Sequence, residues 1–345
     1  MSYAFAETGL ETQIELRPFG NDDGLPVFIT PRIRELGEDP DAAVAWVRDQ
    51  QDELDKLLLK AGAVVLRDFA FRSTADFARA IDHYPTVASG YTAGSTPRST
   101  ISGKVMEATR VPADLKIPLH QEMTYLPHHP AKLAFFCNQP PATGGFTTLG
   151  NARHVLGLAP FELRQEIEHR GVRYVRNFRS PDFEIDDPQF RANHRSWIEA
   201  FGTDDRRQIE ADCGAMGLEW EWLPDGSLSV AHTARGLIEH PVTGETIWFN
   251  QIHMQTVNRK LYTDEVLRSM DTIYGGGRAR PYVTTFGDGG ILPGDQVEDL
   301  LSTIERLEIV FPWQKGDILL IDNLQSYHGR TPFTGERDIQ VALLN

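Results

Sequence analysis

The sequence has little cysteine, fewer basic than acidic residues, and no long apolar run. Its two cysteines, Cys137 and Cys213, are too few and too far apart for a disulfide framework, and we expect both to be reduced core thiols. The first residues resemble no secretory signal, and no apolar stretch approaches the roughly 18 residues that span a bilayer. We therefore expect a cytoplasmic protein that does not cross a membrane.

The charge balance disfavours one large class of partners. Asp and Glu together number 49 and Lys and Arg together number 34, which gives a net charge of −15. Nucleic acids and anionic membranes are held mainly by clustered cationic groups, and this chain has no basic block. The same balance does not exclude a cationic pocket. We therefore expect a small-molecule substrate and no nucleic acid, and the composition does not indicate an oligomeric state.

Apolar spacing predicts a core of strands with helices around it. Residues 41–60 have the spacing of an amphipathic helix, and residues 117–125 and 132–139 have the pattern of strands. Two strong apolar strands, 316–323 and 337–344, close the chain. Strands near both ends of the core and helices clustered early and in the middle favour the α+β class.

The middle of the chain differs from its flanks. Residues 153–217 are mostly helical by pattern, and no repeat or low-complexity linker divides the sequence. We therefore expect one domain over residues 1–345. Its predicted core is a double-stranded β-helix, a cupin-like jelly roll, with flanking helices and a helical insertion at about 153–217.

A candidate metal-ligand pair stands in His120-Gln121-Glu122. Alternate residues of a strand point to the same face, about 7 Å apart along the backbone, so this imidazole and this carboxylate would face one side. A second imidazole, His328, follows the apolar strand 316–323. Two histidines and one carboxylate leave coordination positions open, which suits non-haem iron(II) better than a closed structural zinc site.

Two further residues suit a dicarboxylate co-substrate. A dicarboxylate that chelates the metal at one end leaves its other carboxylate free. A guanidinium such as that of Arg337 binds a carboxylate through two parallel hydrogen bonds, which a lysine cannot match. Thr147 offers a hydroxyl to the same group, and Gly144 and Gly145 before it permit a tight backbone turn.

Together these residues resemble the iron(II)- and 2-oxoglutarate-dependent oxygenases of the TauD/TfdA family. The similarity is greatest to the SyrP-like amino-acid hydroxylases, and clavaminate synthase is a more distant relative. It covers most of residues 60–345. The stretches that carry it are GSTPRSTISG (94–103), VPADLKIPLHQEMTY (111–125), FFCNQPPATGGFTTL (135–149), GTDDR (202–206), LPDGSL (223–228), HPVTGETIWFNQ (240–251) and GDILLIDNLQSYHGRTPFTGERDI (316–339).

The resemblance implies a site and a reaction. It implies that His120, Glu122 and His328 hold Fe(II), and that Thr147 and Arg337 bind the far carboxylate of the co-substrate 2-oxoglutarate. The implied reaction uses O2 to hydroxylate an unactivated C–H bond of a small amino-acid-like substrate. That substrate would be free or tethered to a carrier protein. The resemblance also implies specialised metabolism, such as antibiotic biosynthesis.

Details of the family pattern bear on the role of Arg330, on the reaction and on the substrate. Arg330, in His-Gly-Arg, would support the site electrostatically. Glu122 stands where many members of the family have aspartate, and members that hydroxylate amino acids also have glutamate there. The presence of this carboxylate implies hydroxylation rather than halogenation. Asp338 follows Arg337 where a second basic residue is frequent. Gln340 lies where taurine-type members carry a later arginine, which disfavours a sulfonate substrate.

Several alternatives stay open at this point. The same hydrogen abstraction could end in desaturation or cyclisation. The fold could instead serve a non-oxidative metal-dependent enzyme or a non-catalytic binding protein. Asn250 and Gln251 are candidates for substrate contact, His128 and His129 are candidates for the rim of the site, and the sequence assigns no role to Arg98.

Overall fold

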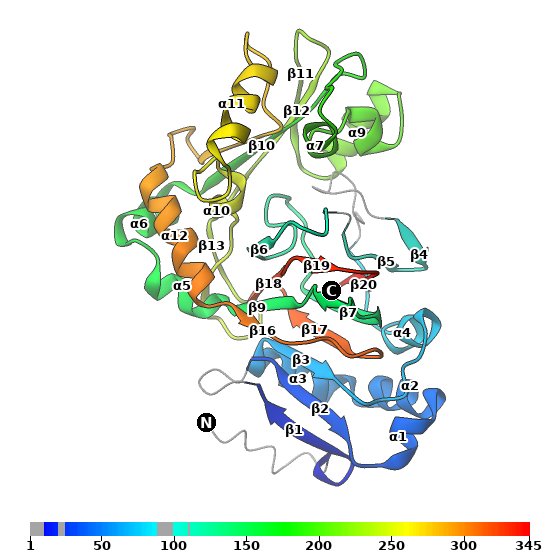
Figure 1. Ribbon diagram of the computed structural model, residues 1–345. Coiled ribbons are helices and arrows are strands. Elements are labelled where there is room, and N and C mark those ends of the chain that lie inside the picture. The colour runs from blue at the N-terminus through cyan, green and yellow to red at the C-terminus, as the bar shows by residue number, and fades with distance from the viewer. Residues whose placement is uncertain (1–9, 20–24, 88–98, 110) are drawn as a thin grey trace.

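Figure 1 shows the computed structural model of the chain, which describes residues 10–19, 25–87, 99–109 and 111–345. Of residues 189 and 192 it describes the backbone alone. Arg98, to which the sequence assigns no role, lies outside the described residues.

An eight-stranded sheet crosses the structure. All its neighbouring strands are antiparallel except the second and third, which run parallel. From edge to edge the strands are β1 (Ile14–Pro18), β2 (Val27–Pro31), β3 (Ala63–Leu66), β17 (Ile318–Asp322), β7 (Lys132–Gln139), β20 (Asp338–Leu344), β5 (Val105–Glu107) and β4 (Thr100–Ser102). Three of the predicted strands, 132–139, 316–323 and 337–344, are thereby confirmed as β7, β17 and β20.

The central strands of this sheet are buried on both faces. Along β7, Leu133 and Phe135 belong to one hydrophobic cluster, whereas Ala134 and Phe136 belong to another. Successive side chains of a strand point to opposite faces, so a continuous apolar run is what a sheet covered on both sides requires. The two expected core thiols, Cys137 and Cys213, are both buried and free.

A second, four-stranded sheet faces the first across one of these clusters. Its strands are β16 (Ile309–Val310), β9 (Thr147–Asn151), β18 (Ser326–Arg330) and β6 (Ile117–His120), in that order and all antiparallel. Leu149 and Tyr327 from this sheet share the core with Phe135 and Leu319 from the larger one. A short pair, β8 (Thr143–Gly144) with β19 (Phe333–Thr334), lies beside them. Two facing sheets of this kind form the predicted jelly roll.

Helices cover the outer face of the large sheet, at the bottom of Figure 1. They are η1 (Leu10–Thr12), α1 (Arg34–Glu38), α2 (Pro40–Asp49), α3 (Gln51–Ala61) and α4 (Thr74–Ala80). The prediction of one helix over 41–60 is therefore wrong, because the chain breaks at Gln50, which has φ −101° and ψ 17°. No proline or glycine marks that break in the sequence. Gly62 ends α3 in the left-handed conformation, at φ 81°.

The segment 153–217 contains the predicted helices and one strand that the pattern did not reveal. Its helices are α5 (Ala152–Leu158), α6 (Phe161–Arg170), α7 (Pro188–Asn193), α8 (Trp197–Phe201) and α9 (Arg206–Ala215). Between them lies β10 (Val172–Phe178), which forms a further sheet in the order β11 (Glu219–Trp222), β12 (Leu228–Ala234), β10, β15 (Tyr282–Phe286). The segment is thus mostly helical, but it also supplies a strand to the upper part of Figure 1.

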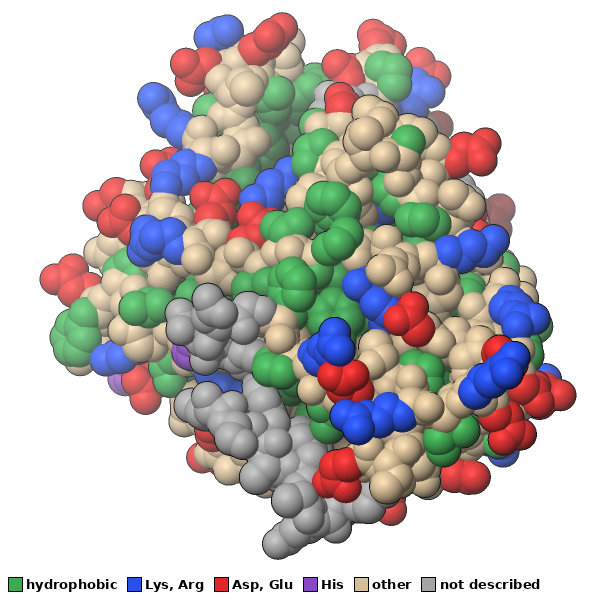
Figure 2. All heavy atoms as spheres, turned by 60° about the horizontal axis from the view of Figure 1, so that its bottom comes forward, with side chains coloured by type: hydrophobic (Ala, Val, Ile, Leu, Met, Phe, Trp, Pro, Cys, Tyr) green, Lys and Arg blue, Asp and Glu red, His purple; other side chains and the backbone are tan. Residues whose placement is uncertain are grey.

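The remaining elements follow β12 in the chain. They are β13 (Leu237–Glu239), β14 (Thr246–Trp248), α10 (Ile252–Gln255), α11 (Asp264–Ile273) and α12 (Gly294–Arg306). Among the described residues, no helix has both the length and the apolar composition that crossing a bilayer requires. Acidic and basic side chains are interspersed over the face shown in Figure 2, in keeping with a sequence that has no basic block.

One predicted strand ends early, and this affects the site. The alternation of residues 117–125 predicts a strand to Tyr125, but β6 ends at His120, and residues 122–125 form a turn. Met123 in that turn has a positive φ of 61°. Glu122 therefore does not stand two residues along a strand from His120, and what holds it in place has to be found elsewhere.

Candidate metal centre and its cavity

The two predicted histidine ligands lie side by side on neighbouring strands. In the four-stranded sheet, His120 of β6 is the direct antiparallel partner of His328 of β18. Their ring centroids are 4.3 Å apart. Side chains opposite each other on paired strands share a face, so the sheet register alone brings these imidazoles together from positions 208 residues apart in the chain.

The strand β6 is the edge of its sheet, and a buried histidine holds its outer side. Nε2 of His253 donates to the backbone carbonyl of Leu119 over 2.8 Å. Burial lowers the pKa of His253 to about 4, so the ring is neutral at neutral pH. On the facing sheet, the ring of Phe135 packs 5.5 Å from that of His328. These contacts fix the two ligand-bearing strands from both sides.

Glu122 joins the two histidines from the turn after β6. Its Oε2 lies 3.6 Å from Nε2 of His328. One ligand atom from each of His120, Glu122 and His328 can be chosen so that all lie within 4.8 Å of one another. Octahedral ligands at about 2.1 Å from a metal are roughly 3 Å apart, so a small side-chain adjustment would suffice for one ion. The structure thus brings the three predicted ligands together.

The hydrogen bonding of His120 suits a metal ligand. Its Nδ1 lies 2.9 Å from the backbone carbonyl of Pro118, an acceptor, so Nδ1 carries the proton. The lone pair is then on Nε2, and a partner of this kind is the usual way in which a ligating histidine is oriented. Two imidazoles and one carboxylate form the set typical of non-haem iron(II) sites. Burial raises the pKa of Cys137 to about 12, so that thiol stays protonated and is a poor ligand.

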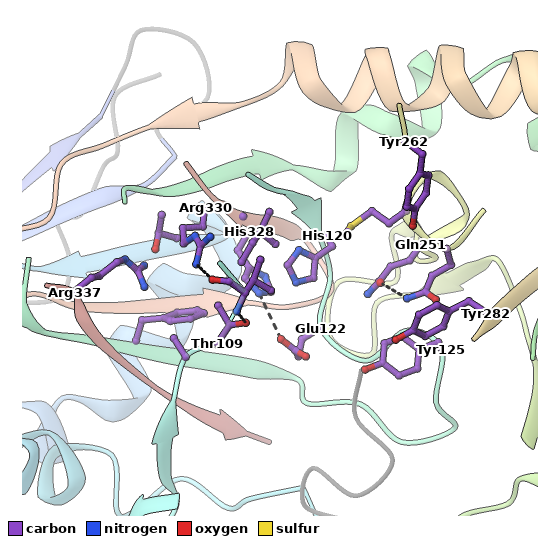
Figure 3. Close-up of a pocket in the computed structure, with 18 residues that line it drawn as sticks. Thr109, His120, Glu122, Tyr125, Gln251, Tyr262, Tyr282, His328, Arg330 and Arg337 are labelled. Carbon is purple, nitrogen blue, oxygen red and sulfur yellow. Dashed lines mark hydrogen bonds and ion pairs between the residues drawn. The ribbon is translucent and has the colours of Figure 1, made fainter. Parts of the chain in front are cut away.

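The three side chains line a cavity of about 210 Å³. Figure 3 shows Arg337 towards one end, Tyr262, Tyr282 and Tyr125 towards the other, and the three candidate ligands between them. The described residues that line the cavity are Ala108, Thr109, Val111, Ile117, His120, Glu122, Tyr125, Phe135, Thr147, Gln251, Met254, Gln255, Tyr262, Tyr282, His328, Gly329, Arg330 and Arg337.

Arg337 is positioned by a glycine turn. Its Nε donates to the backbone carbonyl of Gly145 over 3.0 Å, which leaves both terminal nitrogens to serve the cavity. Gly144 and Gly145 have φ values of 66° and 61°, so the expected tight turn is present. A Cβ on Gly145 would lie 3.1 Å from Cδ of Arg337 and 2.6 Å from Cγ of Pro141. The glycine therefore makes room for the arginine side chain.

The electrostatic state of Arg337 is unusual. Burial, and after it the positive charge of Arg330, lower the pKa of Arg337 to about 10. A half-buried cation with a cationic neighbour favours a ligand that brings negative charge. The guanidinium is still charged at neutral pH, so this end of the cavity attracts a carboxylate.

Thr147 and Arg330 complete the same end. They are direct partners on the paired strands β9 and β18. Nε1 of the buried Trp313 donates to Oγ1 of Thr147 over 3.1 Å, which leaves the hydroxyl proton of Thr147 to donate elsewhere. Arg330 donates to the backbone carbonyls of Val111, Pro112 and Leu115, over 2.9, 2.5 and 2.6 Å. Arg330 thus orders the loop beside the cavity as well as adding charge.

The opposite end of the cavity is aromatic and amidic. Gln251 lines it, whereas Asn250 is fully buried and donates to the carbonyl of Gly236 instead. Nε2 of Gln255 donates to Oε1 of Gln251 over 3.4 Å, and this pair is drawn in Figure 3. The ring of His129 packs 4.5 Å from that of Phe249 and does not line the cavity.

Sequence reasoning missed several of these residues. Trp313, Gln255, Tyr262 and Tyr282 come from irregular segments or short elements, where no local spacing marks them. The one available signal was residue type, because tyrosine hydroxyls and glutamine amides are common polar groups of pockets.

Comparisons with known proteins show the family of the chain. The family model described as "Taurine catabolism dioxygenase TauD, TfdA family" matches residues 29–343. The dapdiamide synthesis protein DdaC of Enterobacter agglomerans is 30% identical over 293 residues, which cover 85% of this chain and 84% of DdaC. A clavaminate synthase-like protein of Arabidopsis thaliana is 32% identical over 304 residues and 86% of each chain.

Solved structures share the fold at low identity. PvcB, described as an Fe, alpha-ketoglutarate dependent oxygenase from an isonitrile synthetic pathway, matches with a TM-score of 0.52 and 16% identity over 96% of this chain and 92% of that chain. A putative alpha-ketoglutarate-dependent taurine dioxygenase from Burkholderia xenovorans gives the same TM-score, identity and coverages. These matches confirm the jelly-roll architecture.

Proposed function

Because the chain belongs to the taurine catabolism dioxygenase TauD, TfdA family, and is therefore an iron- and 2-oxoglutarate-dependent dioxygenase, we propose that it hydroxylates an unactivated C–H bond of a small, amino-acid-like substrate. We propose His120, Glu122 and His328 as the iron ligands. The observation that supports this most is their convergence within 4.8 Å on the wall of a cavity that has Arg337 towards one end.

The residues at the Arg337 end would bind the co-substrate. The terminal nitrogens of Arg337 and the hydroxyl of Thr147 would donate to the far carboxylate of 2-oxoglutarate, the guanidinium through two hydrogen bonds. Arg330 would add positive charge and hold the loop at residues 111–115 over the site. When bound, iron and 2-oxoglutarate together supply, with oxygen, the oxidant that removes a hydrogen atom from the substrate.

The residues at the other end would hold the substrate. Gln251 and Gln255 offer amide groups, and Tyr125, Tyr262 and Tyr282 offer aromatic faces and hydroxyls. Such groups fix the orientation of a small polar molecule, so that one C–H bond faces the metal side of the cavity. The apolar walls around them exclude water. A carboxylate at position 122 favours hydroxylation over halogenation, which needs that coordination position for a halide.

The relatives support a biosynthetic role. DdaC, which is 30% identical over 85% of this chain, is described as a dapdiamide synthesis protein. We therefore place the reaction in specialised metabolism, such as antibiotic biosynthesis, on an amino acid that is free or attached to a carrier protein. The taurine-type alternative is disfavoured because Gln340, at the position considered for a sulfonate-binding arginine, donates to Thr74 instead.

Oxygen uptake coupled to succinate release tests the proposal. The purified protein would be supplied with Fe(II) and 2-oxoglutarate and screened against free amino acids and aminoacylated carrier proteins. We expect one class to stimulate succinate formation, and a product that gains one oxygen atom. His120→Ala and Arg337→Ala should abolish the stimulation. The exposed residues His169 and Arg235 give matched controls, His169→Ala and Arg235→Ala, which should retain it.

The same assay separates the alternatives. A product that loses hydrogen without gaining oxygen would indicate desaturation or cyclisation on the same site. Turnover without oxygen uptake or succinate would indicate a non-oxidative metal enzyme. If neither His120→Ala nor Arg337→Ala changes metal or 2-oxoglutarate affinity, the proposed site is wrong.

A further inference from the structure

Glu122 stands outside the sheet that positions the two histidines. The ladder between β6 and β18 ends at the pair His120 and His328, so Glu122 lies beyond it. The turn that follows includes Met123 at a positive φ of 61°, a conformation that a non-glycine side chain adopts only under external constraint. Some contact other than the sheet must therefore determine where the Glu122 carboxylate lies.

The side chain of Asn323 makes that contact. Its Oδ1 accepts from the backbone N–H of Glu122 over 2.7 Å. Its Nδ2 donates to the backbone carbonyl of Glu122 over 3.1 Å and to that of Pro130 over 2.8 Å. Asn323 is 0% exposed, so all these bonds form away from water. The amide thus holds the Glu122 backbone at both its donor and its acceptor and ties it to Pro130, which lies beyond the turn at residues 122–125.

Asn323 is itself fixed in the turn that precedes the His328 strand. Oδ1 of Asp322 accepts from the backbone N–H groups of Leu324 and Gln325, over 3.0 and 3.1 Å. The backbone N–H of Asn323 donates to the carbonyl of Ala131 over 2.9 Å. The short turn from β17 to β18 therefore sets both the strand that carries His328 and the peptide that carries Glu122.

A second bond joins the same two segments. Nε2 of Gln121 donates to the backbone carbonyl of Leu324 over 2.7 Å, and Nε2 of Gln251 donates to the carbonyl of Gln121. We propose that Asn323 is a positioning residue that, with this support, holds the Glu122 carboxylate at the distance from His120 and His328 that one metal ion requires. This inference rests on the proposed metal site.

The expected consequence is a loss of metal affinity. Without the Asn323 amide, the Glu122 peptide can rotate about the end of β6. The Glu122 carboxylate is then no longer held near the two imidazoles. Changes to residues that orient metal ligands typically cost about 10- to 100-fold in affinity. A buried asparagine with a purely structural role would lower stability without changing metal affinity in the folded protein.

A titration with Mn(II), followed by the electron paramagnetic resonance signal of the free ion, measures this without turnover. We expect wild type to bind one ion, and Asn323→Ala to bind it about 10- to 100-fold more weakly. Asn177 provides a matched control, because its buried amide donates to the carbonyl of Arg280 over 2.7 Å and lies outside the cavity lining. Asn177→Ala should lose thermal stability but keep its Mn(II) affinity within about twofold.

A second variant tests the same inference if Asn323→Ala folds poorly. Asn323→Asp keeps the shape of the side chain and the acceptor for Glu122, but it removes both donors, and we expect a similar loss of Mn(II) affinity. Either variant binding Mn(II) as tightly as wild type, with a native circular dichroism spectrum, overturns the role of Asn323. If wild type binds no Mn(II), or if His120→Ala binds it as tightly as wild type, the proposed metal site is wrong, and the inference about Asn323 is wrong with it.

Discussion

Replacing Arg337 by methionine should separate stability from co-substrate binding. Methionine replaces the apolar stem of the arginine side chain with an uncharged, flexible chain. The loss of the guanidinium removes two charge-assisted hydrogen bonds to the far carboxylate of 2-oxoglutarate. At about 1.5–3 kcal/mol each, these amount to roughly 3–6 kcal/mol, or a weakening of 2-oxoglutarate binding by about 10²- to 10⁴-fold.

The protein without ligands should become slightly more stable. The fall in the pKa of Arg337 to about 10 means that the folded protein disfavours the charged guanidinium. A fall of that size corresponds to about 3 kcal/mol, which we discount to about 2 kcal/mol because the side chain is partly exposed. Losing the bond from Nε to Gly145 costs about 1 kcal/mol. The net gain of about 1 kcal/mol should raise Tm by about 2 °C.

Two measurements on one variant check this reasoning. Isothermal titration of the Mn(II)-loaded protein with 2-oxoglutarate gives the affinity, and calorimetry of the metal-free protein gives Tm. Arg235→Met, at an exposed position, is the control and should change neither. The reasoning is refuted if Arg337→Met binds 2-oxoglutarate within tenfold of wild type, or if it melts well below wild type.

Three further changes should alter the same end of the cavity. Gly145→Ala should weaken 2-oxoglutarate binding by about tenfold, because the added Cβ would press on Pro141 and displace Arg337. An unchanged KM for 2-oxoglutarate would contradict this prediction. Trp313→Phe removes the donor to Thr147 Oγ1, so KM for 2-oxoglutarate should rise severalfold with little change in kcat, and equal loss in both would argue against it. The affinity for 2-oxoglutarate should hold at neutral pH and decline as the pH rises through about 10, because Arg337 is charged below its lowered pKa and neutral above it; titrations across this range should show no such decline in Arg337→Met.

The sequence predicted the parts of the fold that depend on burial. A strand such as β7, covered on both faces, needs a continuous apolar run, and KLAFFCNQ provides one that no exposed segment would carry. The closing strands β17 and β20 follow the same rule. The break between α2 and α3 at Gln50 could not be predicted, because no glycine or proline lies there and the apolar residues keep helical spacing on both sides of it.

The candidate site, too, could be predicted from the sequence only in part. His120 and His328 face each other because of strand register, which the sequence suggests only through their positions near strand ends. Glu122 was the predicted carboxylate, yet the strand geometry used to predict it is wrong, since β6 ends at His120. What places Glu122 is a side chain about 200 residues later in the chain, Asn323, and alternation within a short window cannot reveal such a bond.

The most direct test of the account is a crystal structure of the protein grown without oxygen in the presence of Mn(II) and 2-oxoglutarate. We predict anomalous density for one ion within bonding distance of His120, Glu122 and His328. We also predict the far carboxylate of 2-oxoglutarate on the terminal nitrogens of Arg337. An ion bound elsewhere, or a co-substrate turned away from Arg337, would contradict it.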